Sequence, residues 1–183
     1  WGNNDPVMLK YHDEEWGVLV TDDKKLFEFL ILEGAQAGLS WELILKRREG
    51  YRKAFADFEV KKVANFSDKK IEKLLQDPGI IRNKLKVRSA VHNAKLFIEV
   101  QREFGSFYNY SMQFVGGKPK INKRQKMSDY PATTKESDLF SKDLKEKGFK
   151  FVGSTIIYAH MQACGMVNDH LTSCFRYTEI NNS

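Results

Sequence analysis

The chain has 183 residues, 42% of them hydrophobic and 30% charged, which is enough for a buried core and too apolar for a disordered chain. Two cysteines exclude a disulfide framework, and no apolar run approaches the ~18 residues that a membrane span needs. The net charge of +6 is compatible with a polyanionic partner such as nucleic acid. We expect one soluble domain over residues 1–183, cytoplasmic and monomeric, without membrane association.

Almost every periodic segment of the chain has the spacing of an amphipathic helix. Helices are predicted over residues 22–36, 41–55, 67–77, 80–104, 107–115, 135–147 and 154–164. The basic, turn-rich stretch 116–134 is predicted to be a long loop, and the longest alternating pattern is only the five residues 149–153. The fold class predicted from this pattern is all-α.

The predicted helix 22–36 carries an acidic residue on its apolar side. Residues 26–32 are apolar except Glu28, and at about 100° per residue Glu33 projects nearly opposite Glu28. If Glu28 marks the solvated face, Glu33 points into the core. A buried carboxylate is unfavourable unless it pairs with a cation or serves a ligand, so Glu33 is a candidate functional residue.

The three tryptophans of the chain, Trp1, Trp16 and Trp41, all fall within the first 41 residues, together with Tyr11. Aromatic rings combined with a carboxylate and a hydroxyl suit a site that stacks a flat heterocycle and hydrogen-bonds its edge. Core packing is the commoner role for any single tryptophan, and that alternative stays open.

The segment "LLQDPGIIRNKLKVR", residues 74–88, places a Pro-Gly turn between two predicted helices. Gly79 can adopt a positive φ and leaves room for a phosphate to approach the N–H groups that begin the second helix. Cations surround this point, namely Arg82, Lys84, Lys86 and Arg88. The segment resembles a helix-hairpin-helix element over about 67–104, which grips a DNA backbone, although an ordinary helical connector has the same turn.

His170 and Cys174 are four residues apart, so a helical turn would place both on one face. That spacing suits a metal ion, although two unrelated residues would produce it as well.

Several longer segments carry a resemblance to a known family. They are "YHDEEWGV" (11–18), "LEGAQAGLSW" (32–41), "GIIRNKLKV" (79–87) and "GFKFVGSTIIYAHMQACGMVNDH" (148–170), followed by Cys174. In this order they resemble the signature segments of the bacterial 3-methyladenine DNA glycosylase I family. The resemblance implies two helical lobes around a base-binding cleft. It also implies hydrolysis of the N-glycosidic bond in alkylated double-stranded DNA, which releases free 3-methyladenine and leaves an abasic site.

The resemblance also implies roles for individual residues. Glu33 and Tyr11 would hydrogen-bond the edge of the alkylated base, Trp41 would stack on its face, and Trp1 and Trp16 would line the pocket. Met8 stands where relatives carry a tyrosine. Leu39, in the turn before Trp41, is a candidate to fill the gap that an extruded base leaves.

A structural zinc ion is implied by the resemblance, with His12, His170 and Cys174 as ligands. The fourth ligand is a cysteine expected just upstream of Trp1, outside this chain. No catalytic cofactor is expected. Many helix-hairpin-helix glycosylases carry an aspartate about twenty residues beyond the hairpin, but Glu99 lies near that distance and no aspartate is evident.

No lysine is placed by motif to form a Schiff base, so a monofunctional hydrolase without lyase activity is predicted. Two alternatives remain. One is a catalytically silent helix-hairpin-helix DNA-binding module, and the other is a metallohydrolase that uses His12, His170 and Cys174.

Overall fold

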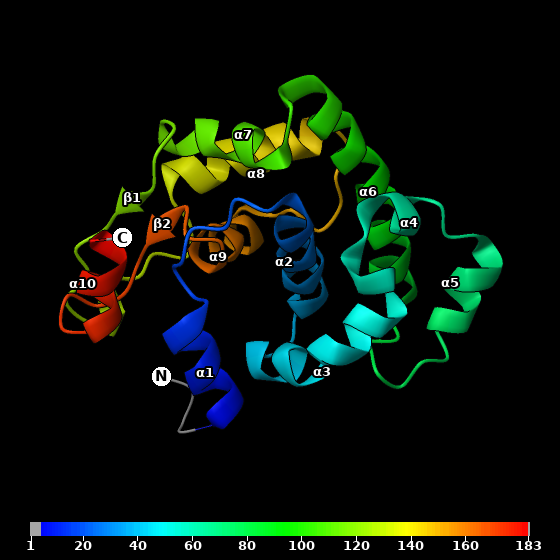
Figure 1. Cartoon of the computed structure of the whole chain (residues 1–183), viewed down its shortest axis with the longest axis horizontal. Helices are drawn as coiled ribbons and strands as arrows, with labels where there is room; N and C mark the ends of the chain where they lie inside the picture. The colour runs from blue at the N-terminus through cyan, green and yellow to red at the C-terminus, as the bar shows by residue number, and fades with distance from the viewer. Residues whose placement is uncertain (1–4, 183) are drawn as a thin grey trace.

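The computed structural model describes residues 5–182, and the fold of this part is almost entirely helical (Figure 1). The α-helices are α1 (Pro6–Glu14), α2 (Asp23–Gln36), α3 (Trp41–Ala54), α4 (Val60–Ala64), α5 (Asp68–Leu74), α6 (Lys84–Phe104), α7 (Phe107–Met112), α8 (Lys135–Glu146), α9 (Ser154–Ala163) and α10 (Phe175–Asn181). Short 3-10 turns are η2 (Ala56–Phe58), η3 (Gln113–Val115) and η4 (Met127–Asp129). The strands β1 (Lys120–Ile121) and β2 (Val167–Asn168) form one parallel pair. The predicted all-α class is confirmed.

Each of the seven predicted helices is present, with small differences at the ends. Three helices were missed, α1, α4 and α10, because they have five to nine residues each and no sustained apolar period. The start of α1 was readable, since Asp5 caps the N–H groups of Val7 and Met8 and Pro6 occupies the first helical position.

Helix α2 is the centre of the molecule (Figure 1). It contacts α3, α6, α7 and α9, and every residue from Leu26 to Ala35 is buried. A helix that is covered all round has no solvated face. Any polar side chain on α2 therefore meets either another protein group or a cavity.

The prediction that Glu28 lies on a solvated face was wrong. Glu28 is buried on α2, and its carboxylate accepts a hydrogen bond of 2.7 Å from Arg48 Nε on α3. Arg48 also makes two hydrogen bonds, of 2.7 and 2.8 Å, to the Glu15 carboxylate. The Glu28 charge is thus neutralised inside the protein by a cation from the next helix, which periodicity within α2 could not reveal.

The second helix of the predicted helix-hairpin-helix element begins later than expected. Helix α5 ends at Leu74, but α6 starts at Lys84 with Asn83 as its N-cap, so residues 75–83 form an extended turn that we call the hairpin. Gly79 is in the middle of the hairpin and does not begin a helix. The predicted phosphate site at a helix N-terminus beside Gly79 is therefore wrong in its local geometry.

The alternating segment 149–153 is not a strand within the described part of the chain. Phe149 and Val152 are buried while Phe151 has a positive φ of 55°, so the alternation reflects a connection that runs along the core. The loop 116–134 holds β1 and η4 and pairs with β2, which brings it beside α9.

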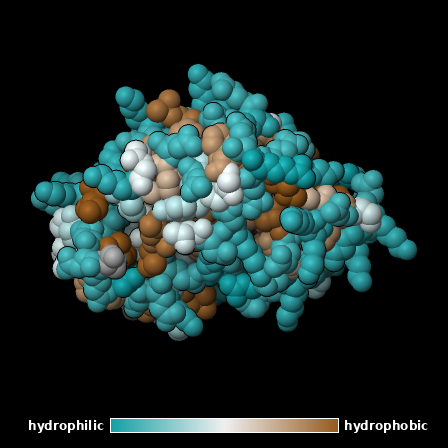
Figure 2. Space-filling model, turned by 45° about the horizontal axis from the view of Figure 1, so that its top comes forward, coloured by the Kyte–Doolittle hydropathy of each residue, from teal (hydrophilic) through white to brown (hydrophobic). Residues whose placement is uncertain are grey.

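Helices α1 and α10 lie at the same end of the molecule, on the left of Figure 1. Figure 2 shows a face that is mostly hydrophilic, with hydrophobic atoms gathered in a few separate patches. No helix within residues 5–182 combines the length and apolar character required to cross a membrane.

Candidate base-binding pocket

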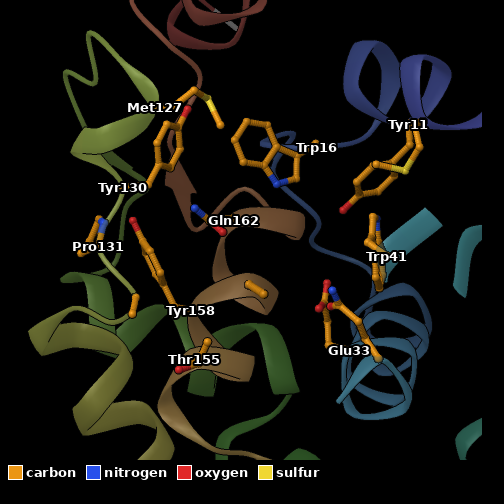
Figure 3. A pocket seen from close by; sticks show the side chains of 14 residues that line it. Tyr11, Trp16, Glu33, Trp41, Met127, Tyr130, Pro131, Thr155, Tyr158 and Gln162 are labelled. Atoms are coloured by element: carbon orange, nitrogen blue, oxygen red, sulfur yellow. The ribbon is translucent and has the colours of Figure 1, made fainter. Parts of the chain in front are cut away.

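A pocket of about 540 Å³ opens between the helices near the N-terminus and the segment around α9 (Figure 3). One wall consists of Met8, Tyr11, Trp16, Glu33, Gln36 and Trp41. The opposite wall includes Met127, Tyr130, Pro131, Thr155, Tyr158 and Gln162. We call these the Glu33 wall and the Tyr158 wall. The pocket therefore combines residues from α1, α2, α3 and α9 with the loop around η4.

Glu33 projects from α2 into this pocket and is 3% exposed (Figure 3). Among residues 5–182 no hydrogen bond or ion pair involves its carboxyl group. Burial alone raises the pKa of Glu33 to about 8. The group is thus predominantly protonated at pH 7, and a cation placed beside it would favour ionisation.

Tyr11 and Trp41 lie beside Glu33 on the same wall (Figure 3). Their ring centroids are 5.5 Å apart with an interplanar angle of 56°, and Tyr11 is 4% exposed. Burial raises the pKa of the Tyr11 hydroxyl well above its ordinary value, so the hydroxyl keeps its proton and can donate it. The Trp41 Nε1–H is buried and has no hydrogen-bond partner in the described structure.

Trp16 also lines the pocket, whereas Trp1 lies outside the described residues. The Trp16 ring stacks on His12, with centroids 6.2 Å apart, and meets the His170 ring edge-on at 4.6 Å. Trp16 therefore connects the pocket to the predicted metal ligands.

The Tyr158 wall was not predicted, and it is organised by Asp169. This side chain is buried and accepts hydrogen bonds from Asn122 Nδ2 (2.7 Å), Gln162 Nε2 (2.8 Å), Arg124 Nε (3.2 Å) and the Tyr158 hydroxyl. The Tyr130 hydroxyl donates to the Asp169 backbone carbonyl at 2.6 Å. Only the fold joins these residues, because they come from three separate segments. The one sign of this wall in the sequence was the polar pair Asn168–Asp169 immediately before His170.

The three predicted metal ligands come together although they are far apart in the sequence. The Cys174 Sγ lies 3.7 Å from His12 Nε2 and 3.6 Å from His170 Nδ1. Their potential ligand atoms all lie within 4.8 Å of one another. The expected helical turn is wrong, however, because His170 precedes α10 and Cys174 is its N-cap.

The outer nitrogen of each imidazole already has an oxygen partner. His170 Nε2 is 2.8 Å from the Trp16 carbonyl oxygen, and His12 Nδ1 is 2.7 Å from Asp13 Oδ1. These contacts leave the inner nitrogens facing Cys174, which is how metal-binding histidines are usually oriented. Desolvation lowers the pKa of His170 to about 4, so its ring is neutral, as a metal ligand must be.

The hairpin packs closely on α3. A Cβ added to Gly50 would lie 2.2 Å from the Gly79 carbonyl oxygen. Arg47 Nη1 donates to the carbonyls of Pro78 at 2.5 Å and Ile80 at 3.3 Å. Gly79 is not among the glycines with a positive φ, so it serves this close approach of two backbones instead of the turn conformation that was predicted.

The predicted DNA-binding cations fall into two groups. Arg82 and Lys84 are exposed, and within residues 5–182 neither makes an ion pair. Lys86 differs, because its ammonium donates to the backbone carbonyls of Ala35 at 2.8 Å and Ala37 at 2.7 Å. Leu39 lies in the adjacent turn and is 37% exposed.

Comparisons with known proteins agree with this geometry. The family model for methyladenine glycosylase matches residues 1–177. DNA-3-methyladenine glycosylase 1 of Escherichia coli (strain K12) is 46% identical over 177 residues, which cover 97% of this chain and 95% of that protein. The chain therefore belongs to the methyladenine glycosylase family, and the predicted resemblance is confirmed.

Solved structures give the same result. A crystal structure of 3-methyladenine DNA glycosylase I is 46% identical, covers 96% of each chain and superposes with a TM-score of 0.93. A substituted 3-methyladenine DNA glycosylase I in complex with 3-methyladenine is 38% identical, with 95% of this chain and 94% of that chain covered and a TM-score of 0.93. Members of this family thus share the whole fold described above.

Proposed function

We propose that this protein removes 3-methyladenine from alkylated double-stranded DNA by hydrolysing the N-glycosidic bond. The observation that carries the proposal is Glu33, a buried carboxyl group without a partner among residues 5–182, which faces a pocket lined by aromatic rings. The related proteins named above are 3-methyladenine glycosylases, and one was solved with that base bound.

The pocket suits the chemistry of this lesion. Methylation at N3 gives the adenine ring a positive charge in DNA, so the base is already a good leaving group. Glu33 ionises beside the cation, and the Trp41 and Tyr11 rings favour an electron-poor heterocycle. An unmodified adenine brings no charge and leaves Glu33 protonated in an unfavourable site. Selection therefore rests on the electron deficiency of the base.

Water attacks the sugar as the base departs. The described lining of the pocket contains no lysine, which agrees with hydrolysis and not with a Schiff-base mechanism. The protein would thus act as a monofunctional glycosylase that leaves an abasic site and releases free 3-methyladenine.

The base must leave the duplex to reach a pocket of this kind. The exposed cations Arg82, in the hairpin, and Lys84, at the start of α6, would hold the DNA backbone, since neither makes an ion pair in the described structure. Leu39 is a partly exposed apolar side chain beside Trp41, and it would fill the vacated space in the stack.

The cluster of His12, His170 and Cys174 would hold a structural zinc ion. One thiolate and two neutral imidazoles are typical zinc donors, and a fourth ligand is required for a closed tetrahedral site. Bound zinc would cross-link α1, through His12, to the start of α10 and so support Trp16. None of the three donors lines the pocket, which argues against the metallohydrolase alternative.

One assay tests the proposal against both alternatives. Purified protein is incubated with methylated duplex DNA with and without a chelator, and released bases are separated by chromatography. Release of 3-methyladenine in both conditions is expected. Binding without release would indicate the silent DNA-binding module, and release abolished at once by the chelator, with the fold intact, would indicate a catalytic metal.

A further inference from the structure

Lys86 connects the hairpin region to the turn that carries Leu39. It lies in the first turn of α6, two residues after the exposed Lys84, while its ammonium reaches the C-terminus of α2. The last carbonyls of a helix have no partner within that helix. Here Lys86 satisfies Ala35 and Ala37, two of the carbonyls at this helix end.

The remaining hydrogen bonds define a short, fixed turn over residues 37–40, which we call the wedge turn. The Leu39 N–H donates to the Gln36 carbonyl at 2.6 Å, and Gly38 has a positive φ of 77°. Ser40 then caps α3 through the N–H of Leu43 at 3.3 Å. The wedge turn thus joins the helix of Glu33 to the helix of Trp41, with Leu39 partly exposed.

The charge of Lys86 adds to this arrangement. A cation at a helix C-terminus interacts favourably with the partial negative charge of the helix dipole. Two of the three ammonium protons are already donated to carbonyls, and burial lowers the pKa of Lys86. The side chain is therefore occupied inside the protein, in contrast to Lys84.

We infer that Lys86 is a positioning residue, which fixes the wedge turn relative to the hairpin so that Leu39 is already in place when the DNA backbone is held. This inference rests on the proposed function and deepens it. Lys86 acts on extrusion of the base, whereas Glu33, Tyr11 and Trp41 act on the base once it is in the pocket. Loss of Lys86 should slow excision from duplex DNA and leave affinity for the free base unchanged.

The test uses Lys86→Met, which keeps the length and removes the charge and hydrogen bonds, with Lys84→Met as a matched control. Single-turnover excision from methylated duplex DNA is expected to fall about 10- to 30-fold in Lys86→Met, comparable with the loss of a positioned group. Affinity for free 3-methyladenine, measured by quenching of tryptophan fluorescence, should stay within about twofold.

Salt titration of duplex binding distinguishes a positioning role of Lys86 from a direct contact with phosphate. Lys84→Met should flatten the dependence of log K on log salt by about 0.9, while Lys86→Met should leave that slope unchanged. An equal flattening in both variants would overturn the inference, because Lys86 would then contact phosphate.

A double variant tests whether Lys86 acts through Leu39. Excision by Leu39→Ala and by Leu39→Ala with Lys86→Met should differ by less than about twofold, since the second substitution removes support for a side chain that is absent. Multiplicative losses would overturn the inference.

Lys86→Arg serves as the second variant if Lys86→Met does not fold, because a guanidinium can bond both carbonyls. Lys86→Arg should retain most of the excision rate. A loss equal to that of Leu39→Ala would contradict the positioning role of Lys86. An active wild-type protein with an unaffected Lys86→Met would refute this inference alone. A wild-type protein that releases no base would refute the proposed function.

Discussion

Two buried carboxyl groups lie on opposite sides of one pocket and have opposite surroundings. Glu33 is 3% exposed and has no hydrogen-bond or ion-pair partner in the described structure, and Asp169 is 1% exposed and accepts from four side chains. Burial alone raises the pKa of Glu33 to about 8. Both groups are excluded from water, so the difference between them lies entirely in their partners.

The contrast separates a group that maintains the structure from one that binds a ligand. A satisfied carboxylate stabilises the folded state and orients the residues that donate to it. An unsatisfied one lowers stability, and such a group persists where a ligand completes it. Asp169 therefore fixes the Tyr158 wall, while Glu33 is the group that the base would complete in the proposed function.

Removing the satisfied carboxylate should have the largest effect. Asp169→Ala leaves Arg124 without its counter-ion and several donors unpaired, so the free energy of unfolding should fall by about 3–5 kcal/mol. Urea unfolding followed by circular dichroism measures this. The control is Asp68→Ala, since Asp68 pairs with Arg88 at an exposed position and should cost less than about 0.5 kcal/mol. Equal losses in the two variants would show that the hydrogen bonds to Asp169 stabilise the fold no more than an exposed ion pair does.

Replacing the unsatisfied carboxyl should affect activity and not stability. Glu33→Gln keeps the shape but cannot ionise beside a cationic base, so single-turnover excision should fall about 100-fold, equivalent to about 2.7 kcal/mol. Its free energy of unfolding at pH 7 should equal or exceed that of the wild type, because a buried ionisable group has been removed. Undiminished excision would contradict the role of Glu33.

The raised pKa of Glu33 predicts a pH dependence. The ionised fraction of a group with pKa about 8 increases roughly tenfold between pH 7 and pH 9, so kcat/KM should rise by about that factor. Glu33→Gln should show no such rise. A flat wild-type profile with a sloping variant profile would assign the pH dependence to another group.

The same pKa affects stability with a definite sign. The folded protein binds the Glu33 proton more tightly than the unfolded chain, whose carboxyl keeps its ordinary pKa of 4.5. The contribution of Glu33 to stability is complete below pH 4.5 and is lost as the pH rises towards 8. The Tm of the wild type should therefore fall relative to that of Glu33→Gln as the pH rises from 4.5 to 8.

The smallest effect is expected for a substitution on the Tyr158 wall. Tyr158→Phe removes one of the donors to Asp169, and the other three remain, so unfolding should become easier by about 1 kcal/mol. The affinity for free 3-methyladenine should change little, since the Tyr158 hydroxyl donates to Asp169 and the ring that lines the pocket is kept. A loss as large as that of Asp169→Ala would show that Tyr158 alone holds the wall.

The amphipathic helices were predictable because their apolar faces repeat over several turns. Helix α6 keeps its period through 21 residues, and short elements such as α4 have too few turns to show one. The late start of α6 could not be predicted, since it depends on how the hairpin packs against Gly50 on α3. Packing between distant segments leaves no local pattern.

The Glu33 wall was predictable in part for a similar reason. An acidic residue in a run of apolar ones is visible along one helix, although the expected solvated position of Glu28 was wrong. The partners of Glu28, Asp169 and Lys86 each come from another segment, so only the fold shows which charged side chains have partners.

The contact between Gly50 and Gly79 leaves no room for a side chain, so the hairpin and α3 are packed directly against each other. Helix α3 begins with Trp41, so the hairpin proposed to hold a DNA strand and the pocket proposed to read a base are set at a constant separation. The enzyme would then inspect one nucleotide at a fixed count from the phosphates it grips, and lengthening the hairpin by a residue would shift which nucleotide is sampled.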